Sequence, residues 1–255
     1  MLLVIDVGNT NIVLGVWRGQ KLLHRYRLRT ITGRTSDELG VLFLDLFRNS
    51  QLEGRPTGAI ISCVVPDQLR ALQQTCERFF SVTPLVVGPG IRTGLPILAD
   101  NPREVGADRI VNAVAAFQRV RKACVVVDFG TATTFDCVSQ KGEYLGGIIA
   151  PGFQISAEAL TRRTSKLPRV EIARPRTVIG KNTIHSMQSG LFFGYVSLVD
   201  GLVRRILEEL DSQGTPEVLA TGGLATVIAA ESATIDKVVD DLTLEGLRIL
   251  FESNA

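Results

Sequence analysis

Short apolar runs that end in a polar turn are the main pattern along this chain. Residues 2–5, Leu-Leu-Val-Ile, are followed by Asp6, one apolar residue, a glycine and a cluster of amide and hydroxyl side chains. Residues 125–127, Val-Val-Val, are followed by Asp128 and the same order of residue types. Each run has the composition of a buried strand, and the cluster after it predicts a turn. The sequence therefore predicts the same strand-and-turn unit at two places.

The segments after the two turns also resemble each other. Each turn is followed by a second apolar strand, a short polar turn with a glycine, and a third strand, which is the order of a β-meander. A repeated strand, turn and meander indicates an internal duplication, so we divide the chain into two related halves, 1–117 and 118–255. The strands expected after the first turn are 12–17 and one that passes through Tyr26 and Leu28; those expected after the second turn are 135–138 and 144–149.

Helical patterns fill the segments between the predicted strands. Thr35 and Glu38 have the spacing of a capping box, and the apolar residues after them fall on one helical face. Pro66 is expected to open a second helix, because proline is favoured at the first helical position. Further strands at 59–65 and 85–87 alternate with these helices, which is typical of an α/β fold.

A long helix is predicted in the second half, from about residue 183 to residue 210. Gly190, Gly194 and Gly201 lie within it, and each costs an isolated helix about 1 kcal/mol relative to alanine. Close backbone packing would explain these glycines, either inside one subunit or across the interface of a homodimer. Both alternatives stay open on the sequence.

Two further segments have the composition of ligand-binding loops. Residues 88–101 are rich in glycine and proline, and loops of this length in compact domains are usually functional. Residues 217–220 predict a strand that runs into a Thr-Gly-Gly sequence at 221–223, where paired glycines let a flat ring or a phosphate approach the backbone. We expect this second segment on the adenosine side of a nucleotide site.

Composition argues against several classes of protein. The net charge is +2 for 255 residues and the basic residues are scattered, so nucleic acid is not expected as a partner. No apolar stretch approaches the roughly 18 residues needed to span a bilayer, and no basic segment precedes the first strand, so we expect a cytoplasmic protein without a membrane partner. The four cysteines lack C-x-x-C spacing and are expected to be buried free thiols, and a zinc site is not expected with two histidines.

The two turns have the residue types of a phosphate-binding site. Gly8 and Gly130 allow backbone amides to approach a bulky anion, where a side chain would collide with it. Asp6 and Asp128 would repel phosphate directly, so they are better suited to hold a cation or its water shell. A single copy could be only a strand-terminating turn, but two copies facing each other would form a nucleotide cleft. Side chains that could add hydrogen bonds to phosphate are Thr10, Asn11, Thr131, Thr133 and Thr134.

The spacing of glycines excludes the common nucleotide-binding motifs. Residues 180–183, Gly-Lys-Asn-Thr, imitate the end of a G-x-x-x-x-G-K-[ST] sequence, but Pro175 stands where its first glycine should be. No G-x-G-x-x-G sequence follows the first strand either. We therefore predict a duplicated ribonuclease-H-like fold of the actin-like ATPase and sugar-kinase class, with mixed sheets flanked by helices, that closes over ATP.

A kinase of this class needs a base near the acceptor hydroxyl. Asp108 comes just before an apolar helical pattern, so it lies near a helix start, where a negative charge is stabilised. A simple N-terminal helix charge is the alternative interpretation. Its neighbour Arg109 and its place between the two turns favour a role in the site.

Several ordered motifs resemble those of the type III pantothenate kinases over nearly the full chain. The resemblance implies transfer of the γ-phosphate of ATP to the primary hydroxyl of pantothenate, the first committed step towards coenzyme A. It also implies Mg²⁺ bound with ATP, a monovalent cation, K⁺ or NH₄⁺, and a homodimer. The motifs are DVGNTN at 6–11, NPREVGADR at 101–109, DFGTATT at 128–134, GGIIAPG at 146–152, GKNT at 180–183 and TGG at 221–223.

The same resemblance implies roles for single residues. Asp108 would be the proton acceptor, Asp128 would bind the monovalent cation, and Thr183 would reach the substrate across a dimer interface. Many relatives carry a tyrosine where this chain has Ala99, which concerns substrate affinity more than reaction type. The implied ATP-binding residues are Asp6, Val7, Gly8, Asn9, Thr10, Asn11, Ile12, Val13 and Thr131, and the implied pantothenate-binding residues are Gly106, Ala107, Asp108, Arg109 and Thr183.

Two other functions stay open on the sequence. Some relatives were first described as accessory factors in transcription, so a non-catalytic nucleotide-binding transcriptional accessory factor is one alternative. A kinase or phosphatase of the same superfamily that acts on a sugar or a short acid is the other. The presence of Asp108 argues against the first alternative, and the pairing of the GADR and GKNT motifs argues against the second.

Overall fold

The computed structural model describes residues 1–210 and 214–255, and these form two compact units. The first unit contains residues 1–115 and 241–255, and the second contains residues 116–240. The C-terminal residues therefore group with the first unit, a placement that the sequence division at 117/118 did not include. Each unit is described below by itself.

The first unit is built on a five-stranded sheet in the order β3-β2-β1-β4-β5. Strand β1 pairs antiparallel with β2 and parallel with β4, so the sheet is mixed. The strands are β1 (Leu2–Val7), β2 (Asn11–Arg18), β3 (Lys21–Arg29), β4 (Gly58–Cys63) and β5 (Leu85–Val86). The helices are α1 (Ser36–Asn49), α2 (Pro66–Phe80), the 3₁₀ helix η1 (Pro102–Glu104) and α7 (Leu242–Asn254), and α3 (Ala107–Val120) runs on into the second unit.

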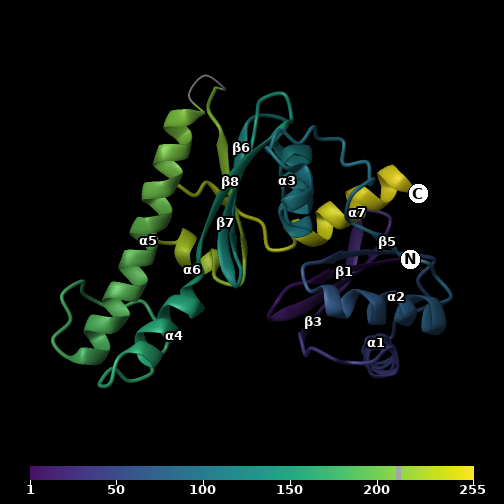
Figure 1. Ribbon diagram of the computed structural model, residues 1–255, viewed down its shortest axis with the longest axis horizontal. Coiled ribbons are helices and arrows are strands. Elements are labelled where there is room, and N and C mark those ends of the chain that lie inside the picture. Colours follow the sequence, from purple (N-terminus) through teal and green to yellow (C-terminus); the bar gives the residue numbers. More distant parts are fainter. Residues whose placement is uncertain (211–213) are drawn as a thin grey trace. The chain divides into compact units, whose positions relative to one another are not determined.

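Side chains alternate across the first sheet, as strand geometry requires. Leu3, Ile5 and Val7 of β1 pack into a buried cluster with apolar residues of α1 and α2. These two helices lie side by side (Figure 1). Helix α7 packs against β1 and β4, where the Phe251 ring fills the space that a side chain at Gly58 would need. The first sheet therefore has helices on both faces.

The second unit repeats this topology with different residues. Its sheet has the order β10-β9-β6-β7-β8, and β6 pairs antiparallel with β7 and parallel with β9. Strand β6 thus corresponds to β1, and the predicted duplication is present. The elements are β6 (Cys124–Phe129), β7 (Ala132–Val138), β8 (Tyr144–Pro151), α4 (Phe153–Arg163), α5 (Thr183–Glu209), β9 (Glu217–Gly222), α6 (Ala225–Ala229) and β10 (Lys237–Val238).

Helix α5 covers one face of the second sheet (Figure 1). Val125, Val127 and Phe129 of β6 alternate towards it and pack into a buried cluster with α5 and α6 residues. The predicted glycines of this helix, Gly190, Gly194 and Gly201, have no described atom within 4 Å of the place that a Cβ would occupy, apart from the adjoining backbone of the helix itself. Packing inside the described part of the subunit therefore does not explain them.

Local sequence signals are confirmed at several helix ends. Thr35 is the N-cap of α1, and its side chain and that of Glu38 make both bonds of the capping box. Pro66 is the first residue of α2. The four cysteines are free as expected, but Cys63 is only half-buried, while the other three are buried. Burial raises the pKa of the Cys76 and Cys124 thiols to about 12. Within residues 1–210 and 214–255, no helix is both long and apolar enough to cross a membrane.

Candidate active site

The first phosphate turn connects β1 to β2. Asp6 is half-buried near the end of β1, in register with Val13 of β2 and Ser62 of β4. The turn is closed by the Gly8 N–H, which donates to the Asn11 carbonyl oxygen at 2.9 Å. Asn9 and Thr10 are exposed at its tip. Asn9 and Thr10 thus present polar groups at the turn that the sequence predicted after the first strand.

Thr30 holds this first turn in place, although the sequence did not indicate it. It follows β3 directly, and its hydroxyl donates to the Gly8 carbonyl oxygen at 2.7 Å. Its backbone N–H donates to the Thr10 carbonyl oxygen at 2.9 Å. Two bonds from one residue therefore fix both sides of the turn, and both depend on β3 returning beside β2.

The second phosphate turn connects β6 to β7. Asp128 lies in register with Thr134 of β7 and Thr221 of β9, so two hydroxyl-bearing residues flank the carboxylate. Gly130 and Thr131 are exposed at the tip of the turn. Gly222 has φ +93°, and a Cβ there would lie 2.6 Å from the Asp128 carboxylate oxygen Oδ1 and 2.7 Å from backbone atoms of Phe129. A glycine is required at 222 because both its backbone conformation and this space exclude a side chain.

Thr133 and Thr134 have partners within the protein. The Thr133 side chain is fully buried, and its hydroxyl shares a hydrogen bond with the hydroxyl of Tyr195 from α5. The expectation that Thr133 binds phosphate is therefore wrong, because its hydroxyl points into the core. Thr134 donates to the Asp136 carboxylate at 3.2 Å. Burial raises the pKa of Tyr195, and the nearby negative charge of Asp128 also raises it.

Asp108 lies in the first turn of α3 and is half-buried. Burial raises the pKa of its carboxyl group, while the N–H of Arg109, which donates to Oδ1 at 2.9 Å, and the Arg109 charge oppose that rise. A Cβ at Gly106 would lie 2.7 Å from the same oxygen, so this glycine makes room for the carboxylate. A carboxylate with a raised pKa is suited to accept a proton from a hydroxyl group.

The segment before Asp108 is ordered by its own side chains. Asn101 caps η1 by accepting from the Arg103 N–H at 3.3 Å, and its amide donates to the Glu104 carboxylate at 2.6 Å. Further back, the Asn254 amide of α7 exchanges two 2.8 Å hydrogen bonds with the backbone of Arg92. The loop that leads to Gly106–Arg109 is therefore attached to α7 within the first unit.

Thr183 is the first residue of α5, in the second unit, and it is exposed. The preceding Asn182 is the N-cap, and its side chain accepts from the His185 N–H at 2.9 Å. Of the sequence-predicted residues, the structure places 6–13 and 106–109 in the first unit. Asp128, Thr131 and Thr183 lie in the second.

Oxygen donors are available for a hard cation near Asp128. Its carboxylate, flanked in register by Thr134 and Thr221, has the donor type that such cations prefer, and Gly222 leaves the carboxylate its space. In the part of the chain that the structure describes, no group of three or more His, Cys, Asp or Glu side chains could hold a metal ion. A cation at Asp128 would therefore also need oxygens of other kinds.

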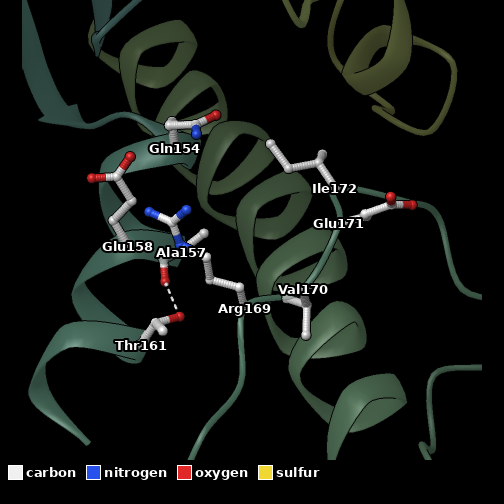
Figure 2. A pocket seen from close by; sticks show the side chains of 8 residues that line it. All are labelled: Gln154, Ala157, Glu158, Thr161, Arg169, Val170, Glu171 and Ile172. Atoms are coloured by element: carbon white, nitrogen blue, oxygen red, sulfur yellow. Dashed lines mark hydrogen bonds between the residues drawn. The ribbon is translucent and has the colours of Figure 1, made fainter.

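A pocket of about 370 Å³ lies elsewhere in the second unit, between α4 and residues 169–172. Figure 2 shows that Arg169 extends across it towards Glu158, on the facing helix. None of the sequence-predicted site residues is among the eight that line it: Gln154, Ala157, Glu158, Thr161, Arg169, Val170, Glu171 and Ile172.

The repeated topology and the two strand-ending turns define a protein of the actin-like ATPase and sugar-kinase fold class. A glucokinase of the ROK family from Streptomyces griseus, solved with glucose and AMPPNP, has this fold: its TM-score is 0.56 at 11% identity, covering 97% of this chain and 98% of that one. A structure from Campylobacter jejuni described as a Baf family transcriptional activator has a TM-score of 0.59 at 17% identity, covering 99% of this chain and 98% of that one.

Sequence comparison is more specific than the fold. A model of the type III pantothenate kinase family matches residues 2–205, and the chain belongs to this family. A relative from Pelobacter propionicus, described as a type III pantothenate kinase, is 59% identical over 256 residues, which covers 100% of both chains.

Proposed function

We propose that this protein transfers the γ-phosphate of ATP to the primary hydroxyl of pantothenate, giving 4'-phosphopantothenate in the first step of coenzyme A biosynthesis. The observation that carries the proposal is the half-buried Asp108 carboxylate with its raised pKa, within the GADR motif of a chain that belongs to the type III pantothenate kinase family. Such a reaction would take place in the cytoplasm, and it requires neither a nucleic acid nor a membrane as partner.

ATP would be bound through residues 6–13 and Thr131. The backbone of the first turn, closed by the Gly8 bond to Asn11, suits the approach of phosphate oxygens. Thr131 is exposed at the tip of the second turn, where its hydroxyl can add a hydrogen bond. Mg²⁺ would accompany ATP and offset the phosphate charge, and Asp6 is suited to hold its water shell.

Pantothenate would be bound through residues 106–109. Asp108 would orient the primary hydroxyl and accept its proton as the phosphoryl group is transferred. The guanidinium group of Arg109 has the geometry to hold the substrate carboxylate through two hydrogen bonds. Phosphoryl transfer depends mainly on alignment and charge neutralisation, and these two side chains would supply the alignment on the acceptor side.

Asp128 would hold the monovalent cation, K⁺ or NH₄⁺. The fit rests on its carboxylate, the neighbouring Thr134 and Thr221 hydroxyl groups, and the space kept open by Gly222. A cation there would supply positive charge near the phosphates. Asp128, Thr134 and Thr221 are thus the residues of this chain that would provide side-chain oxygens to the site.

The protein would act as a homodimer in which Thr183 contributes to the partner's substrate site. Support comes from α5, where Gly190, Gly194 and Gly201 have no described neighbour at their Cβ positions. The side chains of Leu198 and Ile184 on the same helix are 36% and 47% exposed. A second copy of α5 would bury these apolar groups and let the two backbones approach closely.

The test is ADP release from ATP and Mg²⁺, with and without pantothenate, in K⁺ buffer and then in Na⁺ buffer. Release that depends on pantothenate and is stimulated by K⁺ is the expected result. If folded protein binds ATP but releases no more ADP with pantothenate in either buffer, the proposed function is wrong. A panel of sugars and short hydroxy acids in the same assay would then identify another acceptor.

A further inference from the structure

Tyr195 contacts both strand ends that flank the second phosphate turn. Phe129, the last residue of β6, and Thr133 of β7 are opposite each other in register, and the turn lies between them. The Tyr195 ring packs on Phe129 with 6.1 Å between ring centroids, and its hydroxyl shares a hydrogen bond with the Thr133 hydroxyl. One side chain of α5 thus touches both sides of the turn from within the core.

The position of Tyr195 is itself fixed by packing. Its side chain belongs to the buried cluster of the second unit and is only 6% exposed. The Phe153 ring meets it edge-on, with 5.1 Å between centroids and an interplanar angle of 74°. Phe153 follows Gly152, whose Cα lies so close to the Thr131 carbonyl oxygen that no Cβ would fit. Tyr195 therefore contacts the strand ends beside the turn, and Gly152 lies against the turn itself.

The residue that holds the first turn, Thr30, has a counterpart without a side chain in the second unit. Strand pairing ends at Asn11 with Arg29 in the first unit and at Ala132 with Pro151 in the second, so Gly152 corresponds to Thr30. Thr30 holds the first turn with its hydroxyl, whereas Gly152 has no side chain with which to do so. In the second unit, Tyr195 of α5 brings a side-chain hydroxyl to the strand end beside the turn.

We infer that Tyr195 is a positioning residue that, through Thr133, holds the second phosphate turn in the geometry that binds ATP. The inference rests on the proposed function, because it takes the turn as part of the ATP site. Because Tyr195 is buried in the core, it acts on the ATP site through Thr133 rather than through a contact of its own. Its hydroxyl fixes the strand end, and the exposed Thr131 is presented at a constant place as a result.

The experiment compares Tyr195→Phe with Tyr144→Phe. Tyr144 is a matched control, since its buried hydroxyl donates to Asp136 at 2.8 Å in the same sheet but does not touch the turn. ATP with Mg²⁺ is titrated into each variant by calorimetry without pantothenate, and the Michaelis constants are measured separately. Tyr195→Phe should weaken ATP binding about tenfold, as the loss of a buried hydroxyl that bonds both Thr133 and the backbone of Phe153 allows. It should leave the KM for pantothenate unchanged, whereas Tyr144→Phe should alter neither constant by more than about twofold.

A double-mutant cycle separates the hydroxyl bond from general destabilisation. Thr133→Val removes the side-chain partner of this hydroxyl, so it should also weaken ATP binding, and the two changes together should cost no more than Tyr195→Phe alone. Thr133→Ser keeps a hydroxyl and should retain most of the ATP affinity that Thr133→Val loses. Hydrogen exchange at residues 129–133 should quicken in Tyr195→Phe but not in Tyr144→Phe.

Two outcomes would overturn the inference. One is that Tyr195→Phe binds ATP as tightly as the unaltered protein. The other is that Tyr144→Phe, at equal loss of thermal stability, weakens binding as much. Because binding is measured without pantothenate, a protein that binds ATP but does not phosphorylate pantothenate would contradict the proposed function alone, and the comparison of the variants would still decide the role of Tyr195.

Discussion

Asp108 lies in the first turn of a helix, and the pKa of its carboxyl group is raised. Burial is the main cause of the rise, so the folded chain holds this proton more tightly than the unfolded chain does. The ionised carboxylate therefore lowers the free energy of unfolding at neutral pH. This loss of stability decreases as the pH falls through the raised pKa, because the folded chain then takes up the proton and the carboxyl group is neutral. A group retained at such a cost is typical of a catalytic position.

We expect Asp108→Asn to lower kcat by at least about a hundredfold, because a general base is lost, while ATP still binds. The same change should raise the melting temperature at pH 7, and the gain should shrink as the pH approaches the ordinary carboxyl pKa of about 4. Thermal melts across this pH range and steady-state kinetics test both effects. Asp45→Asn, which removes an exposed partner of Arg48, is the control and should change neither. Near-normal turnover would remove Asp108 from the proposed role.

Gly222 leaves the space that the Asp128 carboxylate occupies. Asp128→Ala should abolish stimulation by K⁺. Gly222→Ala should weaken it with the carboxylate still present, because its Cβ would displace Oδ1 and also press on the backbone of Phe129, next to Asp128. Gly146→Ala controls for the backbone conformation alone: it has φ +117° and so carries similar backbone strain, but nothing lies within 4 Å of its Cβ position. ADP release is measured against K⁺ concentration for all three variants. An unchanged K⁺ response in Asp128→Ala would show that the cation binds elsewhere.

At the scale of elements, each phosphate turn depends on a neighbour that is distant in sequence. Thr30→Val keeps the side-chain volume but removes the 2.7 Å bond to the Gly8 carbonyl oxygen, so we expect the KM for ATP to rise about fivefold, as one hydrogen bond of about 1 kcal/mol allows. Thr57→Val removes a similar hydroxyl bond to a backbone carbonyl, that of Met1 at the other end of β1, and should leave KM unchanged. Equal KM values in the two variants would contradict a role for Thr30 in the turn.

Sequence reasoning predicted the elements whose signals are local and missed the contacts that are not. The strand-ending turns, the Thr35 capping box and the start of α2 depend on neighbouring residues and are present. Helix α4 was not predicted, because Ile155 and Leu160 are 44% and 38% exposed and form no buried apolar face. The bond between Thr133 and Tyr195 joins residues 62 positions apart, so it depends on how α5 packs. Because this contact is not visible in the sequence, Thr133 was included among the side chains that could bind phosphate.

At the scale of the whole molecule, the duplication gives one chain two turns with different supports. Thr30, at the end of a strand of the first sheet, holds the first turn by hydrogen bonds. Tyr195 of α5 contacts the strand ends beside the second turn. Helix α5 also begins at Thr183 and carries the three glycines whose Cβ positions have no described side chain or other element nearby. An interface on α5 would therefore involve the same helix that supports the second turn. The proposed homodimer would thus join subunits through an element that is part of the site.

If Thr183 acts in the partner's site, two inactive variants should complement each other. Asp108→Asn subunits mixed with Thr183→Ala subunits would form dimers in which one site has both native residues, so random exchange at equal amounts should restore about one quarter of the unaltered activity. ADP release is measured after exchange, with mixed dimers verified by mass spectrometry. The control replaces Thr183→Ala by a subunit carrying both changes, which provides no complete site and should restore nothing. No recovery in verified mixed dimers would mean that Thr183 and Asp108 of one chain serve the same site, and α5 would then owe its glycines to some other contact.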